Sequence, residues 1–333
     1  MLGCMGVAAV TGASGFLGSA VVRALVADGR RVRALVEPGA DPRNLDQLDI
    51  ERVTCDVTDA RATREAVGGC DTVFHLAAIY KLWTPDPAPL WRVNVEGTTN
   101  VMLAAQAAGV RRVVHTSSIM AMGLAAEGPT DESVRFGSFD VAGVYSMTKH
   151  VSERVVMRFA EAGLPVVVVN PSMPFGPGDR APTPTGRTLL TILEGRVPAV
   201  GHGNLSLIDV DDCARGHVLA AERGVVGERY ILSAHDVSIR TFVESVCRLA
   251  GLRAPRVHAP RWVGAAVALG LEKWSDWVSH EEPRLTVREA RFTQRCPTFS
   301  NRKAVTDLGL RVRPLDETLQ RAIDWFRAEG MAP

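Results

Sequence analysis

The sequence predicts an α/β fold in which a doubly wound parallel sheet is followed by a smaller, mostly helical C-terminal lobe. Short, continuous apolar strands alternate with helical stretches through the first half, which is typical of a parallel sheet covered on both faces. A glycine-rich turn joins the first strand to the first helix. After Asn170 the composition becomes turn-rich, so we expect a second lobe against the carboxyl edge of the sheet.

Runs of β-branched residues and stretches of helical sequence place the elements of the first half. Strands are predicted at Val7–Thr11, Arg31–Val36, Arg52–Asp56, Val73–Leu76, Arg112–Thr116 and Val166–Asn170. Helices are predicted at Phe16–Asp28, Arg61–Val67, Leu90–Ala108 and Ser146–Ala162.

The second half begins with two Pro/Gly-rich segments, 171–179 and 181–186, which predict neither helix nor central strand. Beyond them we expect helices near Arg187–Glu194 and Asp211–Arg223, short strands near Leu205–Val210 and Arg229–Leu232, and mainly helical sequence afterwards. We therefore divide the chain into residues 1–170 and 171–333, with segments near 204–232 returning to the first domain.

The composition excludes several classes of protein. The 333 residues carry a net charge of +1, so no electrostatic footprint for nucleic acid is visible. Six scattered cysteines without a C-x-x-C spacing predict a reduced, cytoplasmic protein with neither a disulfide framework nor a metal site. The N-terminus runs directly into a strand, so we expect no targeting segment.

The glycine-rich turn predicts a dinucleotide site and a Rossmann-like first domain. Gly12, Ser14, Gly15 and Gly18 lie between the first strand and the first helix. Gly12 permits the tight turn, Gly15 lets the backbone approach a pyrophosphate, and Gly18 lets the helix pack on the strand. The N–H groups at the helix N-terminus would bind the phosphates.

The end of the second strand favours NAD over NADP. An acidic residue there accepts hydrogen bonds from the ribose hydroxyls and repels a 2′-phosphate, and this chain has Glu37. Arg33 and Arg43 are close enough in sequence to weaken this inference, so NADP stays open. Asp56 and Val57, after the third strand, could contact the adenine, or Asp56 could simply cap its loop.

Three residues predict catalysis. Ser118 follows the fifth strand, and Tyr145 and Lys149 lie four residues apart, on one face of a helix and roughly 5–6 Å apart at Cβ. A serine hydroxyl, a phenol and an ammonium suit hydride-transfer chemistry. Ser118 would bond the substrate carbonyl, Tyr145 would exchange its proton, and Lys149 would lower the pKa of Tyr145.

These motifs together resemble a known family. Thr11–Gly18, His75–Ala78, Asn94–Thr98, Thr116–Ser118, Tyr145-x-x-x-Lys149 and Asn170-Pro171 resemble those of the extended short-chain dehydrogenase/reductases, the NAD-dependent epimerase/dehydratase family. Within it, Tyr80–Trp83 and Pro182–Arg187 look most similar to the dihydroflavonol-reductase-like group, particularly hopanoid-associated sugar epimerases. Bacterial 3β-hydroxysteroid or sterol dehydrogenases look like near relatives.

The resemblance implies roles for individual residues. Besides the turn and Glu37, the cofactor would be held by Phe16, Leu17, Leu76, Ala77, Ala78, Thr116, Lys149, Pro171, Ser172 and Met173, with Asn94 supporting the site from behind. The substrate would contact Ile79, Tyr80, Trp83, Met120 and Thr185. The loop around Tyr80 and Trp83 is largely apolar and aromatic, and core packing explains Ile79 about as well as substrate contact does. A homodimer through the helices at 90–108 and 146–162 is also implied.

Other residues have simpler interpretations. His75 lies in an apolar strand end and is expected to be a buried structural histidine, and Asp209, Asp211 and Asp212 are expected to cap a helix. Residues 262–277 predict a packed amphipathic helix. The alternative is a peripheral contact with the inner face of the membrane, useful for a lipid-like substrate.

Three functions follow from these residues. The first is an NAD(P)-dependent oxidoreductase acting on a secondary alcohol or ketone of an apolar, polycyclic substrate that is sterol-, hopanoid- or flavonoid-like. The second is a sugar epimerase that retains its NAD and acts in hopanoid-type lipid biosynthesis. The third is a non-enzymatic dinucleotide sensor, against which the presence of Ser118, Tyr145 and Lys149 argues.

Overall fold

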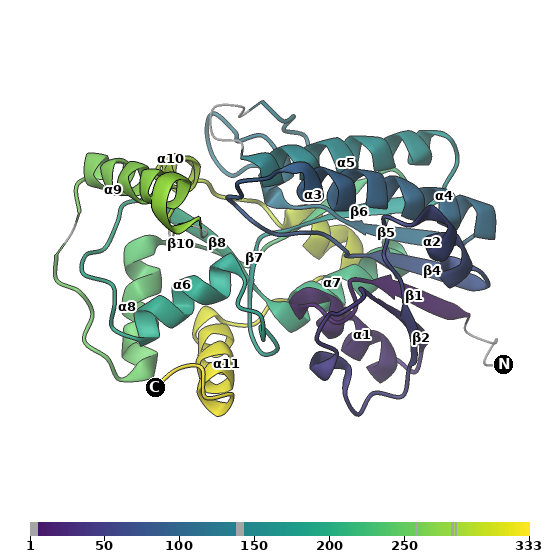
Figure 1. The fold of residues 1–333 in the computed structure, drawn as a ribbon, viewed down its shortest axis with the longest axis horizontal. Helices are drawn as coiled ribbons and strands as arrows, with labels where there is room; N and C mark the ends of the chain where they lie inside the picture. The colour runs from purple at the N-terminus through teal and green to yellow at the C-terminus, as the bar shows by residue number, and fades with distance from the viewer. Residues whose placement is uncertain (1–5, 138–142, 258, 281–282, 284) are drawn as a thin grey trace.

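A seven-stranded parallel sheet forms the larger part of the molecule. The computed structural model describes residues 6–137, 143–257, 259–280, 283 and 285–333 (Figure 1). The sheet has the strand order β3-β2-β1-β4-β5-β6-β9, and all its neighbours pair in parallel. Its strands are β1 (Val7–Thr11), β2 (Arg31–Val36), β3 (Glu51–Thr54), β4 (Cys70–His75), β5 (Arg112–Thr116), β6 (Val166–Pro171) and β9 (Arg229–Leu232).

Helices cover both faces of this sheet, as the buried apolar runs of its central strands require. One face packs against α1 (Phe16–Ala27) and α7 (Val210–Arg223). The other packs against α2 (Ala60–Val67), α4 (Thr98–Ala108) and α5 (Val144–Glu161) (Figure 1). The predicted doubly wound α/β fold is confirmed.

The helix predicted at 90–108 has a wider turn in it. It begins as α3 (Ala88–Trp91), widens to a π-helical turn at Arg92–Gly97, and continues as α4. Single π-turns often lie at functional sites. Asn94, one of the predicted site residues, lies in this turn.

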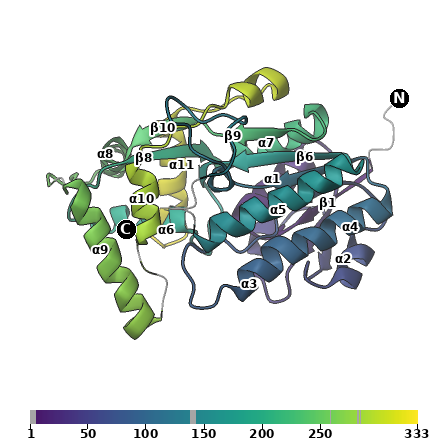
Figure 2. The ribbon, with the colours of Figure 1, turned by 90° about the horizontal axis from the view of Figure 1, so that it is seen from above.

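A smaller lobe is built around a three-stranded sheet of order β10-β8-β7. Its strands are β7 (Met173–Phe175), β8 (Asn204–Asp209) and β10 (His235–Ser238). Its helices are α6 (Pro184–Leu193), α8 (Ile239–Ala250), α9 (Arg261–Trp274), α10 (Val287–Gln294) and α11 (Leu315–Ala328). Figure 2 shows α8, α9 and α10 at the end of the molecule away from α2 and α4. Short helical turns complete the chain at Arg43–Leu45, Ile119–Ala121, Ser275–Ser279 and Ala304–Leu308.

The two halves of the sequence interleave. From the second half, β9 pairs with β6, and α7 with Ala304 and Leu308 packs into the core of the large sheet. By contrast, β8 joins the small sheet. The division at residue 170 stays our interpretation of this arrangement.

One expectation about the second half is wrong. Residues 184–186, predicted to be non-helical, are the first turn of α6. The Thr183 side chain caps this helix by accepting from the Gly186 N–H, and Pro184 stands in its first turn. Proline is tolerated there because that N–H has no intrahelical partner in any case.

Candidate active site

The turn between β1 and α1 is shaped to receive an anion. Gly12 has φ +64°, and a Cβ on Gly18 would collide with the Gly12 carbonyl oxygen, so helix and turn are in contact there. No side chain caps the N-terminus of α1, and its first turn carries no acidic residue. Its N–H groups therefore stay available for phosphate oxygens.

Acidic side chains mark one end of the cavity beside this turn. Glu37 and Asp41 line the wall after β2. Arg33 points elsewhere, since its guanidinium donates to Glu51 at 2.8 Å and to the Ala66 carbonyl oxygen at 2.9 Å. Arg43 pairs with Asp41 at 2.6 Å. Neither arginine lines the cavity, so the two residues that weakened the inference from Glu37 do not oppose it.

Asp56 holds its own loop, as one of its two predicted roles requires, and its contact with the adenine stays a prediction. It lines the cavity together with Val57. Its carboxylate also accepts from the backbone N–H and the hydroxyl of Thr58, both at 2.8 Å, and so holds its own loop.

The three predicted catalytic residues meet at the carboxyl end of β5. Ser118, Tyr145 and Lys149 all line the cavity, and each is less than a tenth exposed. The helix α5 places Tyr145 and Lys149 on one face, one turn apart. The Ser118 hydroxyl oxygen accepts from the Met120 N–H at 3.1 Å.

The pKa of Tyr145 lies above its ordinary value in this structure, and the effect of Lys149 on it stays a prediction. Burial raises the pKa of Tyr145 to about 12, and a hydrogen bond with the Ser118 side chain only partly opposes this. The Lys149 ammonium donates to the Thr116 carbonyl oxygen at 2.6 Å. Burial lowers the pKa of Lys149 to about 8, against the effect of the Glu153 carboxylate.

Two buried polar groups support the site from behind. The Asn94 amide accepts from the Ile79 N–H at 2.7 Å and donates to the Thr148 hydroxyl at 3.0 Å, which ties the loop after β4 to α5. Asn94 does not itself line the cavity. His75 contacts the hydroxyls of Thr11 and Thr98, and burial lowers its pKa to about 3, as expected of a structural histidine.

A single cavity of about 860 Å³ joins these features to the small lobe. It is lined by every predicted cofactor residue except Asn94, including Ser14, Phe16, Leu17, Leu76, Ala77, Ala78, Pro171, Ser172 and Met173. Ser172 is 5% exposed, and its hydroxyl has no partner among the described residues. It remains free to bond a ligand.

The far end of the cavity is mainly apolar. Leu205, Ile239, Phe242, Val243 and Phe292 line it, all from the C-terminal lobe. The predicted substrate residues Ile79, Tyr80, Met120 and Thr185 line the cavity, whereas Trp83 does not. The Trp83 indole instead donates to Asp276 at 3.3 Å.

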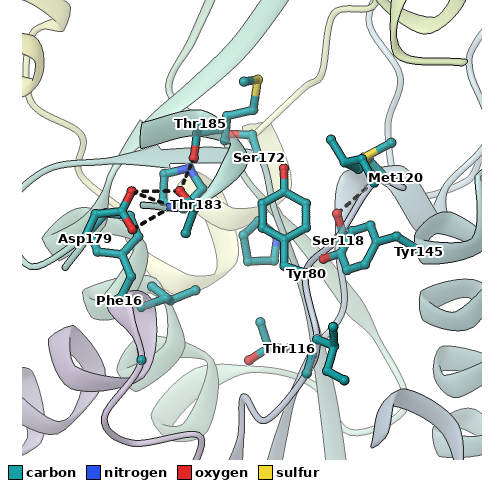
Figure 3. A pocket seen from close by; sticks show the side chains of 18 of the residues that line it. Phe16, Tyr80, Thr116, Ser118, Met120, Tyr145, Ser172, Asp179, Thr183 and Thr185 are labelled. Atoms are coloured by element: carbon teal, nitrogen blue, oxygen red, sulfur yellow. Dashed lines mark hydrogen bonds between the residues drawn. The ribbon is translucent and has the colours of Figure 1, made fainter. Parts of the chain in front are cut away.

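The Tyr80 side chain stands between Tyr145 on one wall of the cavity and Asp179 on the opposite wall (Figure 3). Its ring lies 4.7 Å from that of Tyr145. On the opposite wall is Asp179, which sequence reasoning missed because it follows a Gly/Pro turn and looked like a loop residue. Its carboxylate is 2% exposed and accepts from the N–H and hydroxyl of Thr183 at 2.9 and 2.8 Å. Burial raises the pKa of Asp179 to about 6.

Of the three acidic residues near α7, Asp209 has the predicted capping role, and Asp211 and Asp212 lie in the first turn of the helix. Asp209 caps α7 by accepting from the Asp211 N–H, and it pairs with Arg313 and Arg321. No group of three or more potential metal ligands is found among the described residues.

Comparison with known proteins decides the family. The sequence profile of the NAD dependent epimerase/dehydratase family matches residues 8–233, two thirds of the chain. The chain belongs to this family. It is therefore an NAD(P)-dependent enzyme of the extended short-chain dehydrogenase/reductase type, as its motifs indicated.

Individual relatives cover nearly the whole chain. It is 36% identical to a protein named as a candidate dihydroflavonol 4-reductase from Synechocystis, over 96% of this chain and 94% of that protein. It is 34% identical to sterol demethylase protein B from Methylococcus capsulatus, over 97% and 98%. The crystal structure of a nucleoside-diphosphate-sugar epimerase from Pseudomonas aeruginosa matches with TM-score 0.81 and 28% identity, over 98% and 99%.

Proposed function

We propose that this enzyme transfers a hydride between NAD and a secondary alcohol or ketone of an apolar, polycyclic substrate. The observation that carries the proposal is the convergence of Ser118, Tyr145 and Lys149 in one cavity wall, between the anion-binding turn and an apolar compartment. The relatives named for dihydroflavonol and sterol chemistry support such a substrate class.

The chain's own residues divide the work. The turn 12–18 would bind the pyrophosphate, Glu37 the adenosine ribose, and Ser172 the nicotinamide carboxamide; the bound dinucleotide supplies or accepts the hydride. Ser118 would donate a hydrogen bond to the substrate oxygen. Tyr145, with a pKa of about 12, keeps its proton at neutral pH and so is prepared to protonate the oxygen of a ketone.

Two variants test the role of the phenol. Tyr145→Phe should abolish turnover, a loss of at least 100-fold, because general acid catalysis typically contributes about 10²–10⁴-fold. Its affinity for NADH should stay within about twofold. Tyr230→Phe is the matched control, since the Tyr230 hydroxyl only accepts from the Val225 N–H in the core. Turnover retained by Tyr145→Phe would remove tyrosine from the mechanism.

The second candidate, a sugar epimerase with retained NAD, is favoured by the similarity to the Pseudomonas epimerase. Sterols, hopanoids, flavonoids and nucleotide sugars should be screened with NAD and NADP in parallel. A dehydrogenase consumes added cofactor in step with its product, whereas an epimerase converts substrate with no net change at 340 nm.

The assembly of the enzyme is proposed from exposed side chains. Trp91 and Leu103 are exposed on the helices at 88–108, at 36% and 50%. These helices would form a homodimer together with α5. Leu103→Glu should shift the protein to monomer in analytical ultracentrifugation, and an unchanged sedimentation coefficient would place the interface elsewhere.

Exposed apolar side chains on α9 and in the turn after it support a peripheral contact with an anionic membrane. Trp274 and Trp277 are 61% and 75% exposed, and Val267, Leu269 and Val278 are at least half exposed beside them. The side chain of Trp262 lies outside the described part of the structure. Residues 252–296 carry eight basic and five acidic residues, against 30 and 32 in the remainder of the chain. An apolar face with tryptophans and local positive charge suits the surface of an anionic bilayer.

Vesicle sedimentation tests this contact. Wild type should bind vesicles containing phosphatidylglycerol, and Trp274→Ala/Trp277→Ala should lose most of this binding. Val226→Ala, at an exposed apolar position between α7 and β9, is the control. Equal binding by all three proteins would contradict the contact. Within the part of the chain that the structure describes, no helix is long and apolar enough to cross a bilayer.

A further inference from the structure

Glu153 is a buried acid that has no role in the site described so far. It lies on α5 one turn beyond Lys149, so Tyr145, Lys149 and Glu153 follow one another at intervals of four residues on one helix face. Its side chain is 5% exposed. A carboxylate is rarely buried unless it is paired, and Glu153 has two partners.

The first partner connects Glu153 to Ser118. The Asn170 amide nitrogen donates to the Glu153 carboxylate at 2.8 Å and also to the Ser118 carbonyl oxygen at 3.1 Å. Asn170 lies in β6, directly before the residues that line the cofactor end of the cavity. Glu153 therefore fixes the orientation of the amide that holds the backbone of Ser118.

The second partner connects Glu153 to the loop after Thr130. Arg229 in β9 donates to the Glu153 carboxylate at 3.0 Å. The same guanidinium donates to the carbonyl oxygens of Glu132 and Val134 at 2.7 and 3.0 Å. One guanidinium thus holds both the loop and the Glu153 carboxylate.

Burial disfavours the charge of Lys149, whose ammonium also donates to the Thr116 carbonyl oxygen. His75 from β4 and His115 from β5 face Lys149, and burial keeps both neutral, with pKa values far below the usual range. Burial keeps Tyr145 neutral as well. Among the described residues, Glu153 is the group that opposes the effect of burial on the pKa of Lys149. On the same helix, Glu153 raises and Arg154 lowers the pKa of His150, and Arg229 lowers it from β9.

We propose that Glu153 is a positioning residue of the active site: it orients Ser118 through Asn170, and its charge favours the ammonium form of Lys149. This inference rests on the proposed function of Ser118 and Lys149. A carboxylate on the far side of Lys149, away from the cavity, would thereby help to determine how the site behaves with pH.

Binding of NADH, followed by fluorescence from pH 6 to 10, tests the charge of Lys149 without any substrate. Wild type should lose affinity above about pH 8, where Lys149 releases its proton. Glu153→Gln should move this loss to lower pH by about one unit, because a nearby opposite charge shifts a pKa by one unit or more. Arg229→Lys keeps the positive charge while loosening the loop, and its profile should stay in place.

The outcomes separate this inference from the proposed function. An unchanged profile in Glu153→Gln, or an equal shift in Arg229→Lys, would overturn it. Should Glu153→Gln not fold, Glu153→Asp decides in its place, because the shorter carboxylate withdraws from Lys149 and should give a smaller shift in the same direction. An unshifted Glu153→Asp would then overturn it. None of these readings depends on turnover, whereas failure of the proposed function appears as turnover retained by Tyr145→Phe.

The connection to Ser118 has its own test once a ketone substrate is found. At pH 6 Lys149 is protonated in the wild type, and a shift of one unit leaves it mostly protonated in Glu153→Gln. A loss of kcat of tenfold or more at this pH would come from the displaced Ser118. An unchanged kcat would remove the Asn170 connection from the proposal.

Discussion

The buried carboxyl of Asp179 makes a quantitative prediction about stability. Its pKa is raised from 3.8 to about 6 by burial, so the folded protein binds this proton more tightly than the unfolded chain does. A raised acid pKa contributes stability below about pH 4, and that contribution is lost as the pH rises through about 6. The two pKa values differ by about two units at about 1.4 kcal/mol each, so ionised Asp179 costs roughly 3 kcal/mol at neutral pH.

Asp179→Asn removes this cost while keeping the shape of the side chain. Its amide oxygen can still accept from the Thr183 N–H, but the amide hydrogens meet a Thr183 hydroxyl that already accepts from Gly186. An amide N–H of the new asparagine left without an acceptor costs about 1–3 kcal/mol, which offsets part of the stability gained by removing the carboxylate. We expect the variant to be more stable than wild type by at most about 2 kcal/mol at pH 7.5, and less stable than wild type at pH 4.

Urea unfolding at pH 4 to 8 measures the difference between the two proteins. Other carboxyls titrate equally in both and cancel, so the difference should change sign between pH 4 and 6. Asp131→Asn is the control without a slope, because hydrogen bonds from Ser133 lower the pKa of Asp131 and so place its titration below about pH 4. The stability difference between that variant and wild type should stay nearly constant from about pH 4 to 8. Parallel curves for wild type and Asp179→Asn across this range would refute the reasoning.

Two further predictions concern the cofactor end of the cavity. Gly18→Ala places a methyl group against the Gly12 carbonyl oxygen, and overpacking of this kind costs about 1–3 kcal/mol of stability. Calorimetry should therefore show a lower Tm for this variant. Titration should show that it binds NADH at least tenfold more weakly than wild type. Gly270→Ala, in an open part of α9, should instead raise the Tm slightly, and equal behaviour of the two alanines would exclude the close contact. Glu37→Arg should raise the affinity for NADP at least tenfold relative to the affinity for NAD. Asp49→Arg, at a position outside the cavity, should change neither of these affinities. A wild type that already binds NADP more tightly than NAD would show that Glu37 does not select the cofactor.

Local patterns were sufficient where an element depends on its own residues. The strands at 7–11, 31–36 and 112–116 have the predicted bounds, because each is a continuous β-sheet run flanked by turns or helix caps. The strand predicted at 73–76 begins earlier, at Cys70. Its polar entrance, Asp71 and Thr72, looked like a loop, but Asp71 is stabilised there by pairing with Arg30 and Arg111.

In the candidate site too, local patterns predict only the residues that a single strand or helix brings to the site. Ser118, Tyr145 and Lys149 could be predicted because a strand end and a helical spacing of four bring them together. The contacts of Glu153 with Asn170 and Arg229 span 17 and 76 residues, and no local pattern indicates them. The preference of Lys149 for a carbonyl oxygen also depends on packing that sequence spacing does not describe.

The junction between the two sheets has a mechanical consequence. Ser172 is the single residue between β6 of the large sheet and β7 of the small one, and its N–H donates to Leu232 at the end of β9. The neighbouring strand β9 crosses to β10 through only two residues, 233 and 234. A rotation of the C-terminal lobe would bend the chain at these two adjacent strand ends and where β8 runs directly into α7. Since Ser172 is also a proposed contact of the nicotinamide, a substrate that pulls the lobe inward would move the cofactor's reactive ring at the same time.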